Sequence, residues 1–253
     1  MKFDKQICIV TGAASGLGYG IAQKLLDEGA TVILLDVDVS GLERFQLANS
    51  GLANRMMSKK VDVTKFEEVV ACFREVCTIH GRIDYLFNNA GIGGTLPFEE
   101  ATPEKWQKII NLNLYGVING VTAVYPLMVA QKHGHIVNTS SISGLMPFPG
   151  QVLYNTTKYA VTGLSLSLMA EAKKHNISVS IVCPGMVRTR IFYKPIIGDE
   201  APEEYVKIPK EAITVDEAVG DIFAGLARRK KIIVTPRKLE KYYRFYRLFG
   251  VLP

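Results

Sequence analysis

The chain has 253 residues, of which 48% are hydrophobic and 21% are charged. This length and balance indicate one large hydrophobic core and exclude a disordered or fibrous protein. The mean hydropathy of +0.14 is high for a soluble protein, but every uninterrupted apolar run is far shorter than the roughly 20 residues that a membrane span needs. We therefore expect a globular protein without a spanning helix.

The net charge of +6 is concentrated near the C-terminal end. Residues 228–247 contain nine basic residues and one acidic residue, so this segment carries +8 and the remainder of the chain −2. A uniformly basic surface for nucleic acid is therefore not supported, and the basic segment needs its own explanation.

The N-terminal end and the cysteines indicate a reducing compartment. Charged residues lead directly into a short apolar strand without a small-residue cleavage site, which predicts no signal peptide and a cytoplasmic protein. The cysteines are widely spread, and their spacing does not match a zinc ribbon. We interpret them as small buried hydrophobic residues and predict no metal site; they are Cys8, Cys72, Cys77 and Cys183.

Short apolar runs alternate with helix-length segments along nearly the whole chain, which is the pattern of βαβ units. The pattern predicts an α/β fold with a doubly wound, seven-stranded parallel sheet, helices on both faces, and one domain over residues 1–236. The predicted strands lie near Gln6–Val10, Thr31–Leu35, Met56–Val61, Ile83–Phe87, His135–Asn138, Ser178–Cys183 and Lys231–Thr235.

Residues 189–213 interrupt this alternation after the sixth predicted strand and contain Pro195, Pro202 and Pro209. In an open α/β sheet, ligands bind beyond the carboxyl ends of the strands, so we interpret the insert as a substrate lid. The alternative is an ordinary surface loop.

The tail of residues 237–253 is basic and aromatic and has the period of a helix. One hypothesis is that this helix covers the substrate site or packs in a dimer, and the other is that it rests peripherally on an anionic membrane. Its apolar stripe contains Leu239, Tyr242 or Tyr243, Tyr246, and Phe249 or Gly250, whereas Lys241, Arg244 and Arg247 fall elsewhere on the helix.

The first predicted strand runs directly into a glycine-rich loop and then a helix. Glycines let the backbone turn sharply and approach a diphosphate, whose charge the helix N-terminus neutralises. The spacing is Gly-x-x-x-Gly-x-Gly rather than the commoner Gly-x-Gly-x-x-Gly. The predicted dinucleotide-binding loop follows Thr11 and contains Gly12, Ser15, Gly16, Leu17 and Gly18.

The second predicted strand leads to Asp36, whose carboxylate can accept hydrogen bonds from both hydroxyls of an adenosine ribose. The same carboxylate would repel a 2′-phosphate, and no Arg or Lys stands in the glycine loop or directly after Asp36. NAD is therefore favoured over NADP as the cofactor. We interpret Asp38 as a solvated turn residue that adds to the negative field.

Tyr154 and Lys158 stand at the start of a long predicted helix, and Ser141 stands near the end of the fifth predicted strand. Residues i and i+4 share one helix face, so the lysine ammonium lies beside the phenol. A nearby cation lowers a phenol pKa that is about 10 when unperturbed, which predicts Tyr154 as an acid/base. Ser141 is the predicted donor to the substrate oxygen.

Together these motifs resemble the short-chain dehydrogenases/reductases, over nearly the full chain. The resemblance implies a Rossmann-like fold and hydride transfer between nicotinamide C4 and a carbinol carbon, while Tyr154 exchanges the hydroxyl proton. The ordered motifs are the glycine loop, Asp62-Val63, Asn88-Asn89-Ala90-Gly91, Asn113 within Asn111–Gly116, Ser141, Tyr154 with Lys158, and Pro184-Gly185-x-x-x-Thr189.

The resemblance also implies a role for each matched position. Asp62 and Val63 would contact the adenine. Asn113 would steady a water that connects Lys158 to solvent, as the fourth catalytic residue. The cofactor channel and the nicotinamide carboxamide would be contacted by Asn89, Ala90, Gly91, Pro184, Gly185, Val187 and Thr189, together with Tyr154 and Lys158.

The C-terminal end departs from the family. Many members end in an Asp-Gly-Gly turn that contributes to a tetramer interface, whereas this chain has Ile-Ile-Val-Thr235-Pro236 and continues into the basic tail. Because dimers and tetramers are usual in the resembling family, we still expect a homodimer or homotetramer.

The side chains near these motifs predict a largely apolar substrate wall, which suits a hydrophobic secondary alcohol or ketone such as a lipid-, steroid- or retinoid-like molecule. The predicted function is an NAD-dependent oxidoreductase that interconverts the two. The alternative is an NAD(H)-binding sensor or scaffold of the same fold without turnover. The wall contains Ile92–Thr95, Ser143, Leu145–Phe148, Gln151, Met186, Phe192 and Tyr193.

Overall fold

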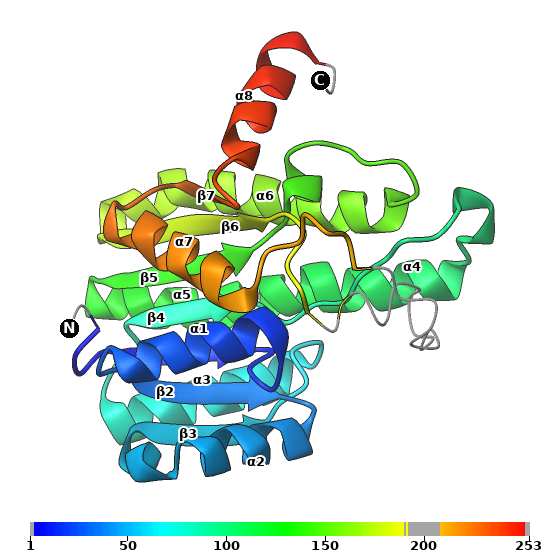
Figure 1. Cartoon of the computed structure of the whole chain (residues 1–253). Coiled ribbons are helices and arrows are strands. Elements are labelled where there is room, and N and C mark those ends of the chain that lie inside the picture. Colours follow the sequence, from blue (N-terminus) through cyan, green and yellow to red (C-terminus); the bar gives the residue numbers. More distant parts are fainter. Residues whose placement is uncertain (1–2, 190, 192–207, 251–253) are drawn as a thin grey trace.

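The computed structural model describes residues 3–189, 191 and 208–250. In this part of the chain, seven strands form one parallel sheet in the order β3-β2-β1-β4-β5-β6-β7 (Figure 1). Every strand lies where the sequence predicts it, with ends shifted by one or two residues, so the predicted fold class is confirmed. The strands are β1 (Ile7–Thr11), β2 (Thr31–Asp36), β3 (Met56–Lys60), β4 (Tyr85–Asn88), β5 (Gly134–Thr139), β6 (Ile177–Pro184) and β7 (Ile232–Thr235).

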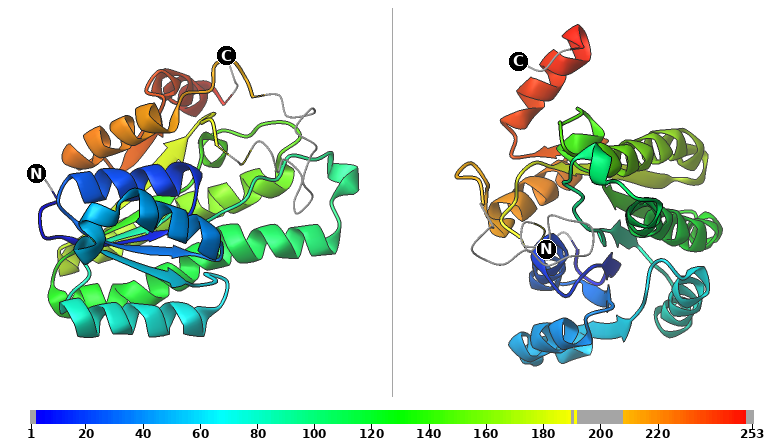
Figure 2. Two further views of the ribbon diagram at one scale, coloured as in Figure 1. Left: turned by 60° about the horizontal axis from the view of Figure 1, so that its bottom comes forward. Right: turned by 90° about the vertical axis from the view of Figure 1, so that its right-hand side faces the viewer.

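Helices cover both faces of the sheet (Figure 2). Helices α1, α2 and α7 share one apolar cluster with the sheet, and α3, α5 and α6 share another. The α-helices are α1 (Gly16–Asp27), α2 (Val39–Ala48), α3 (Phe66–His80), α4 (Pro103–Ile110), α5 (Gly116–Gln131), α6 (Val152–Ala172), α7 (Val215–Ala227) and α8 (Leu239–Phe249). Shorter helical turns are η1 (Ser50–Arg55), η2 (Phe98–Glu100), η3 (Asn111–Tyr115), η4 (Ile142–Gly144) and η5 (Lys173–His175).

The core follows the sequence periodicity. All five residues of β1 are buried, as expected for a parallel strand covered on both faces. In α1, Ile21, Leu25 and Leu26 are completely buried along one stripe. Helix α3 ends at Gly81, whose φ of +76° is the left-handed conformation that favours glycine at a helix end.

The strand order reverses beside β1, because the chain moves one way through β2 and β3 and then returns to add β4 on the other side. This arrangement brings the carboxyl ends of β1 and β4 next to each other, with Val10 paired to Phe87. Such a switch point is where open α/β sheets bind ligands. The glycine loop after β1 and the Asn88–Gly91 segment after β4 therefore meet.

One helical run meets the length and composition of a membrane span, although the apolar runs of the sequence predicted none. Pro103–Gln131 joins α4, η3 and α5, and by length and composition alone it is long and apolar enough to cross a membrane. One such helix is weak support for a span, because the core helix of a soluble protein meets the same criteria. Here Val117, Val121 and Val124 are buried against the sheet. The run is accounted for as a core helix.

Three of the four cysteines are buried as predicted, whereas the lid prediction for the insert stays a prediction. Cys8, Cys72 and Cys183 are buried, Cys77 is half-buried, and all four are free thiols. Residues 190 and 192–207 of the insert lie outside the described residues. At the edges of the insert, Val187 pairs with Ile213 in a parallel bridge, so its two ends are adjacent.

The basic tail forms a helix, α8, which extends away from the body of the molecule (Figures 1 and 2). Leu239, Tyr243 and Tyr246 pack against the core. Of the two alternatives Tyr242 and Tyr243, it is thus Tyr243 that packs inward. Tyr242 and Phe249 are exposed, so the predicted stripe is shorter than the sequence pattern suggested.

Candidate functional site

The loop between β1 and α1 is a close backbone approach that requires glycine. Gly12 has a φ of +68°, and a Cβ there would lie 2.9 Å from the Cα of Ala90. A Cβ on Gly18 would collide with the Gly12 carbonyl oxygen. The loop therefore folds back on the first turn of α1 and leaves no room for side chains at these two positions.

The start of α1 has the properties of an anion site. Ser15 is the N-cap residue, yet its side chain makes no capping hydrogen bond, and the first turn carries no acidic residue. The N–H groups at such a helix start carry partial positive charge. A diphosphate group therefore fits the loop that contains Gly12, Ser15, Gly16, Leu17 and Gly18.

Asp36 lies against the glycine loop at the end of β2. Its Oδ2 accepts a hydrogen bond from the Ala14 N–H at 3.0 Å, and its Oδ1 accepts one from the Asp38 N–H at 3.0 Å. The carboxylate is half-buried and is fixed in orientation by these two bonds. It keeps further acceptor capacity on both oxygens for a diol such as a ribose.

A cation that sequence spacing did not reveal lies near this carboxylate. Arg44, from α2, forms an ion pair with Asp38 at 3.6 Å. Asp38 itself is the N-cap of α2, where its Oδ1 accepts hydrogen bonds from the Gly41 N–H and the Ser40 hydroxyl. The predicted turn role of Asp38 is thereby refined to a helix cap, and the charge near Asp36 is less negative than predicted.

The residues that follow β3 lie at the same carboxyl edge of the sheet, beside Asp36. The Oδ1 of Asp62 accepts hydrogen bonds from the Thr64 N–H at 2.9 Å and the Thr64 hydroxyl at 2.8 Å. Val63 is buried, and its carbonyl oxygen accepts a hydrogen bond from Asn119. Because Asp36 and Lys60 are partners in neighbouring strands, Asp62 follows directly beyond the same sheet edge.

Thr11 ties the ends of β1 and β4 together. Its Oγ1 accepts hydrogen bonds from the N–H groups of Asn89 at 2.9 Å and Ala90 at 3.1 Å, and its carbonyl oxygen accepts one from Asn89 Nδ2 at 3.2 Å. The sequence motifs predicted no separate role for Thr11. The structure shows that it positions Asn89, Ala90 and Gly91 beside the glycine loop.

Lys158 lies beside Tyr154 on α6 and is almost completely buried. Its Nζ donates a hydrogen bond to the Thr139 carbonyl oxygen at 3.0 Å and lies 5.6 Å from the centroid of the Tyr154 ring. The same Nζ would lie 3.7 Å from a Cβ on Gly91. Burial lowers the pKa of Lys158 from 10.5 to about 8.

The pKa of Tyr154 moves opposite to the sequence-based prediction. Burial raises it above 10, which outweighs the lowering effect of the hydrogen bond with the Ser141 side chain, and Cys183 raises it further. The prediction considered only the neighbouring ammonium, whereas desolvation of the phenolate dominates at this position. The phenol is therefore protonated at neutral pH.

Ser141 connects the end of β5 to the end of β6. It is the N-cap of η4, where its Oγ accepts a hydrogen bond from the Ser143 N–H at 3.1 Å. The hydroxyl donates to the Pro184 carbonyl oxygen at 3.3 Å. Together with the hydrogen bond to Tyr154, these contacts place Ser141 and Tyr154 together, as the sequence predicts.

Asn113 lies on the π-helical turn η3 and is completely buried. Its Oδ1 accepts a hydrogen bond from the Ile92 N–H at 2.8 Å, and its Nδ2 donates one to the Ile92 carbonyl oxygen at 2.9 Å. A Cβ on Gly91 would lie 3.0 Å from Asn113 Oδ1. Asn113 thus holds the Gly91–Ile92 backbone beside Lys158.

The segment after β6 arches toward the glycine loop. The Gly185 N–H donates a hydrogen bond to the Thr235 carbonyl oxygen at 2.7 Å. Val187 is buried, and a Cβ on Gly16 would lie 3.2 Å from the Cβ of Thr189. The predicted nicotinamide segment from Pro184 to Thr189 therefore lies between Ser141 and the diphosphate loop.

The predicted substrate residues are only partly gathered at this edge. Ser143 donates a hydrogen bond to Gln151 Oε1 at 3.0 Å, so these two side chains bind each other. Met186 is 42% exposed. Leu145 and Met146 are buried under α8, which corrects their placement on the substrate wall. Phe192 and Tyr193 lie outside the described residues.

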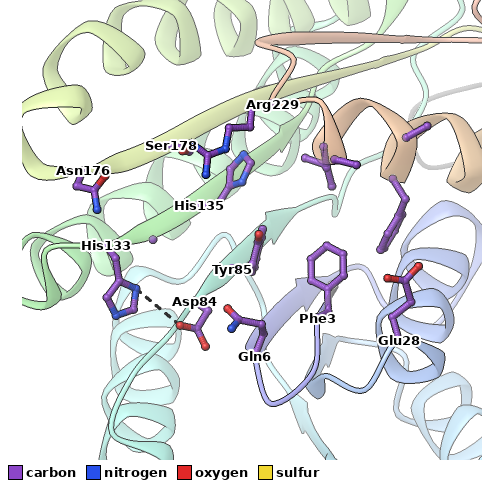
Figure 3. Close-up of a pocket in the computed structure, with 15 residues that line it drawn as sticks. Phe3, Gln6, Glu28, Asp84, Tyr85, His133, His135, Asn176, Ser178 and Arg229 are labelled. Carbon is purple, nitrogen blue, oxygen red and sulfur yellow. Dashed lines mark ion pairs between the residues drawn. The ribbon is translucent and has the colours of Figure 1, made fainter. Parts of the chain in front are cut away.

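A cavity of about 830 Å³ opens at the opposite, amino-terminal ends of the strands (Figure 3). It is lined by Asp84, Tyr85, His135 and Arg229, among others, and by none of the predicted site residues that the structure describes. Burial lowers the pKa of His135 to about 4, so this histidine is neutral. Cavity volume alone would therefore point away from the edge where the motifs meet.

Comparisons with known proteins agree with the geometry. Residues 6–195 match the sequence profile of the short chain dehydrogenase family. The chain is 33% identical over 236 residues to the 3-oxoacyl-[acyl-carrier-protein] reductase FabG of Thermotoga maritima, which covers 93% of this chain and 95% of that protein.

Solved structures show the same fold. A short chain dehydrogenase/reductase from Burkholderia phymatum in complex with NAD superimposes with a TM-score of 0.88 and 26% identity, over 98% of this chain and 95% of that one. A short-chain dehydrogenase from Sphingobium yanoikuyae in complex with NADPH gives a TM-score of 0.83 and 28% identity, over 97% and 92%. Similar proteins thus bind either nicotinamide cofactor.

Proposed function

This chain belongs to the short-chain dehydrogenase/reductase family, and from that premise we propose that it is an NAD-dependent oxidoreductase that interconverts a secondary alcohol and a ketone. The observation that carries the proposal is the buried group of Ser141, Tyr154 and Lys158 at the carboxyl edge of the sheet. Lys158 donates a hydrogen bond to the Thr139 carbonyl oxygen, and the Tyr154 phenol is hydrogen-bonded to Ser141. A buried lysine without a carboxylate partner among the described residues is costly, which favours a chemical role.

The cofactor would be held along the same edge. The glycine loop and the start of α1 would bind the diphosphate, Asp36 the adenosine ribose, Asp62 and Val63 the adenine, and the segment from Pro184 to Thr189 the nicotinamide carboxamide. When bound, the nicotinamide supplies the centre that accepts or donates a hydride.

The protein side chains would manage the proton. Because burial keeps the Tyr154 phenol protonated, it can donate its proton to a ketone oxygen during reduction. In the reverse direction the phenolate would accept the proton of the alcohol. Ser141 would donate a hydrogen bond to the same oxygen. The Lys158 ammonium would stabilise the phenolate after proton transfer, and Asn113 would keep the Gly91–Ile92 backbone and a proton-conducting water in place beside it.

The preference for NAD rests on Asp36. The Ala14 and Asp38 N–H groups fix its carboxylate in orientation, and this carboxylate would accept hydrogen bonds from the ribose diol and repel a 2′-phosphate. Arg44 is the competing cation, but its ion pair with Asp38 already uses part of its charge. We therefore expect tighter binding of NAD(H) than of NADP(H).

The substrate class is a hydrophobic alcohol or ketone of lipid, steroid or retinoid type. Support comes from the exposed Met186 at this edge and from the name of the Thermotoga maritima relative, a reductase of 3-oxoacyl groups. A ketone on an acyl chain is one member of the proposed class. A homodimer or homotetramer, usual in the family, is the proposed assembly.

The test is turnover of the purified protein with hydrophobic secondary alcohols and ketones, followed by the absorbance of reduced nicotinamide, with NAD(H) and NADP(H) in parallel. We expect turnover with NAD(H) and weaker turnover with NADP(H). Turnover with NADP(H) alone would overturn the cofactor proposal. NADH binding without turnover on any member of the panel would favour the sensor or scaffold alternative.

A further inference from the structure

Helix α8 is anchored firmly at its base. The Arg237 Nε lies 2.6 Å from Asp221 Oδ1, and Glu240 pairs with both Lys230 at 3.2 Å and Arg244 at 3.0 Å. On the other side, Leu239 packs against Gly185. These contacts fix the direction in which the helix leaves the body, and two views show it extending outward (Figures 1 and 2).

One face of α8 is used by the protein itself. Leu239, Tyr243 and Tyr246 pack on the cluster that contains Leu145 and Met146. Burial, together with a hydrogen bond that the Tyr159 hydroxyl donates to Tyr246, raises the pKa of Tyr159, on α6, to about 12. Residues of the protein itself therefore cover this stripe of α8, and no external partner is needed there.

A second apolar face of the same helix is exposed. Tyr242, Phe245 and Phe249 recur at helical spacing, and they are 49%, 39% and 63% exposed. Leu248, near the free end, is 78% exposed. The rings of Phe245 and Phe249 lie with centroids 4.6 Å apart. This face is larger than the scattered single apolar residues of an ordinary surface.

The charges around this face are basic and mostly unpaired. Residues 228–247 carry a net +8, and the acidic residue within them, Glu240, is already in ion pairs. Lys238, Lys241 and Arg247 are exposed and have no ion pair among the described residues. At 3.6 residues per turn, Lys238 and Lys241 lie on the side of Phe245 and Phe249, whereas Arg247 points the other way. An aromatic face bordered by free lysines complements an anionic, interfacial surface.

A second copy of this chain is a poorer occupant. A two-fold interface places the same patch against itself, so it would bring the unpaired cations Lys238 and Lys241 of both copies together. Lipid phosphates instead neutralise the cations while the headgroup region takes up the aromatic rings. The charge therefore selects a lipid surface over self-association.

We propose that α8 docks this protein onto anionic phospholipid membranes, with Phe245, Leu248 and Phe249 inserted between the headgroups and Lys238 and Lys241 against the phosphates. The attachment is peripheral. The inner face of α8 packs on Leu145 and Met146, which follow Ser141, so docking brings the candidate active site near the bilayer. That last consequence, delivery of a lipid-like substrate, rests on the proposed function, whereas docking does not.

The test is co-sedimentation of the full chain with vesicles of phosphatidylcholine containing phosphatidylglycerol, and with vesicles of phosphatidylcholine alone. We expect binding to the anionic vesicles, weak binding to the neutral ones, and release at high salt. Leu248→Asp with Phe249→Asp should abolish binding. Lys241→Gln should weaken it about fivefold, since a basic residue at an anionic surface contributes about 1 kcal/mol.

Leu47→Asp is the matched control, because Leu47 is 76% exposed on α2, away from α8. It should leave vesicle binding unchanged. The altered residues are exposed, so circular dichroism and Tm should report intact folds. Failure of the full chain to bind anionic vesicles, or full binding by the double variant, would overturn the proposal.

Two further outcomes separate the proposals. Suppose that the full chain does not bind vesicles, and that sedimentation velocity shows an oligomer for the full chain but a smaller species for the double variant. A second copy then occupies the face, and lipid docking is wrong. If the full chain binds vesicles but no substrate turns over, the proposed function fails and docking stands.

Discussion

The two ends of the parallel sheet both contain buried ionisable side chains, but they satisfy them differently. At the amino-terminal ends, Asp84 accepts the Ile7 N–H at 2.8 Å and pairs with Arg82 at 2.9 Å. At the carboxyl ends, Lys158 has a carbonyl oxygen and an aromatic ring, and no carboxylate within the described residues. A paired charge supports structure, whereas an unpaired buried charge is retained at a cost to stability.

This difference locates chemistry better than cavity volume does. The amino-terminal end holds the cavity of about 830 Å³, yet its buried carboxylate is engaged in structural contacts. The carboxyl end collects Tyr154 and Lys158 from α6, Ser141 from the end of β5 and Asn113 from η3, which are three separate segments. We expect substitutions at the carboxyl end to change turnover and those at the amino-terminal end to change stability.

The largest expected effect is on Tyr154. Tyr154→Phe removes the proton donor and leaves the ring, so turnover should fall about a thousandfold, while NADH binding, followed by fluorescence, should persist. Tyr115→Phe is the control, since Tyr115 is 50% exposed on η3. Undiminished turnover of Tyr154→Phe would refute the proton-transfer role.

The glycine loop offers the next contrast. A Cβ on Gly18 would collide with the Gly12 carbonyl oxygen, whereas a Cβ on Gly220, inside α7, meets nothing within 4 Å. Gly18→Ala should abolish cofactor binding in a calorimetric titration. Gly220→Ala should leave binding intact and stabilise the protein by about 0.5–1 kcal/mol. Equal cofactor affinity in the two variants would contradict the close approach.

The pH dependence of stability tests the unpaired charge of Lys158. Its pKa is about 8 in the folded protein, against an ordinary value of 10.5, so between these two values the unfolded chain binds more protons. Stability should therefore rise with pH across that window, by about 3 kcal/mol from this group. Denaturant unfolding of Lys158→Met should lack this part of the rise.

Turnover gives a second readout of the same group. The ammonium form of Lys158 is lost as pH rises through about 8, so any step that needs this cation should slow over the same range. Parallel pH–stability curves for the protein and for Lys158→Met would show that Lys158 carries no unpaired charge.

The smallest effect is expected at the amino-terminal end. Asp84→Ala leaves the Ile7 N–H without its acceptor and Arg82 without its partner, which should cost about 1–3 kcal/mol of stability. Turnover at a temperature where the variant is folded should not change. Asp27→Ala is the control, because Asp27 is exposed, and it should alter neither stability nor turnover. A loss of turnover without a loss of stability in Asp84→Ala would contradict the comparison of the two ends.

The candidate site was predictable where its geometry is local. Tyr154 and Lys158 are neighbours because one helix face repeats every four residues, and the glycine loop is recognisable between a strand and a helix. Asn113 was distinguishable from Asn111 only through the family resemblance, because its inward direction depends on the π-helical turn and on Ile92, 21 residues away.

Other features needed the folded chain. The Tyr154 pKa was predicted in the wrong direction because its desolvation depends on tertiary packing, which places the side chain against Leu96, Ile109 and Leu153. Arg44 was not predicted to pair with Asp38, because the two residues are not adjacent in the sequence and meet only once α2 has formed. Ser143 and Gln151 were assigned to the substrate, although they hydrogen-bond to each other.

The sequence by itself determined the seven strands, the buried stripes of the helices and the order of the motifs, because these follow from periodicity and residue type along a few turns of chain. Tertiary structure alone decided that Thr11 holds Asn89, that Lys158 meets the Thr139 carbonyl oxygen, and that α8 turns Tyr243 inward and Phe249 outward. The physical reason is that hydrogen-bond partners and desolvation are set by segments that approach only when the sheet is assembled.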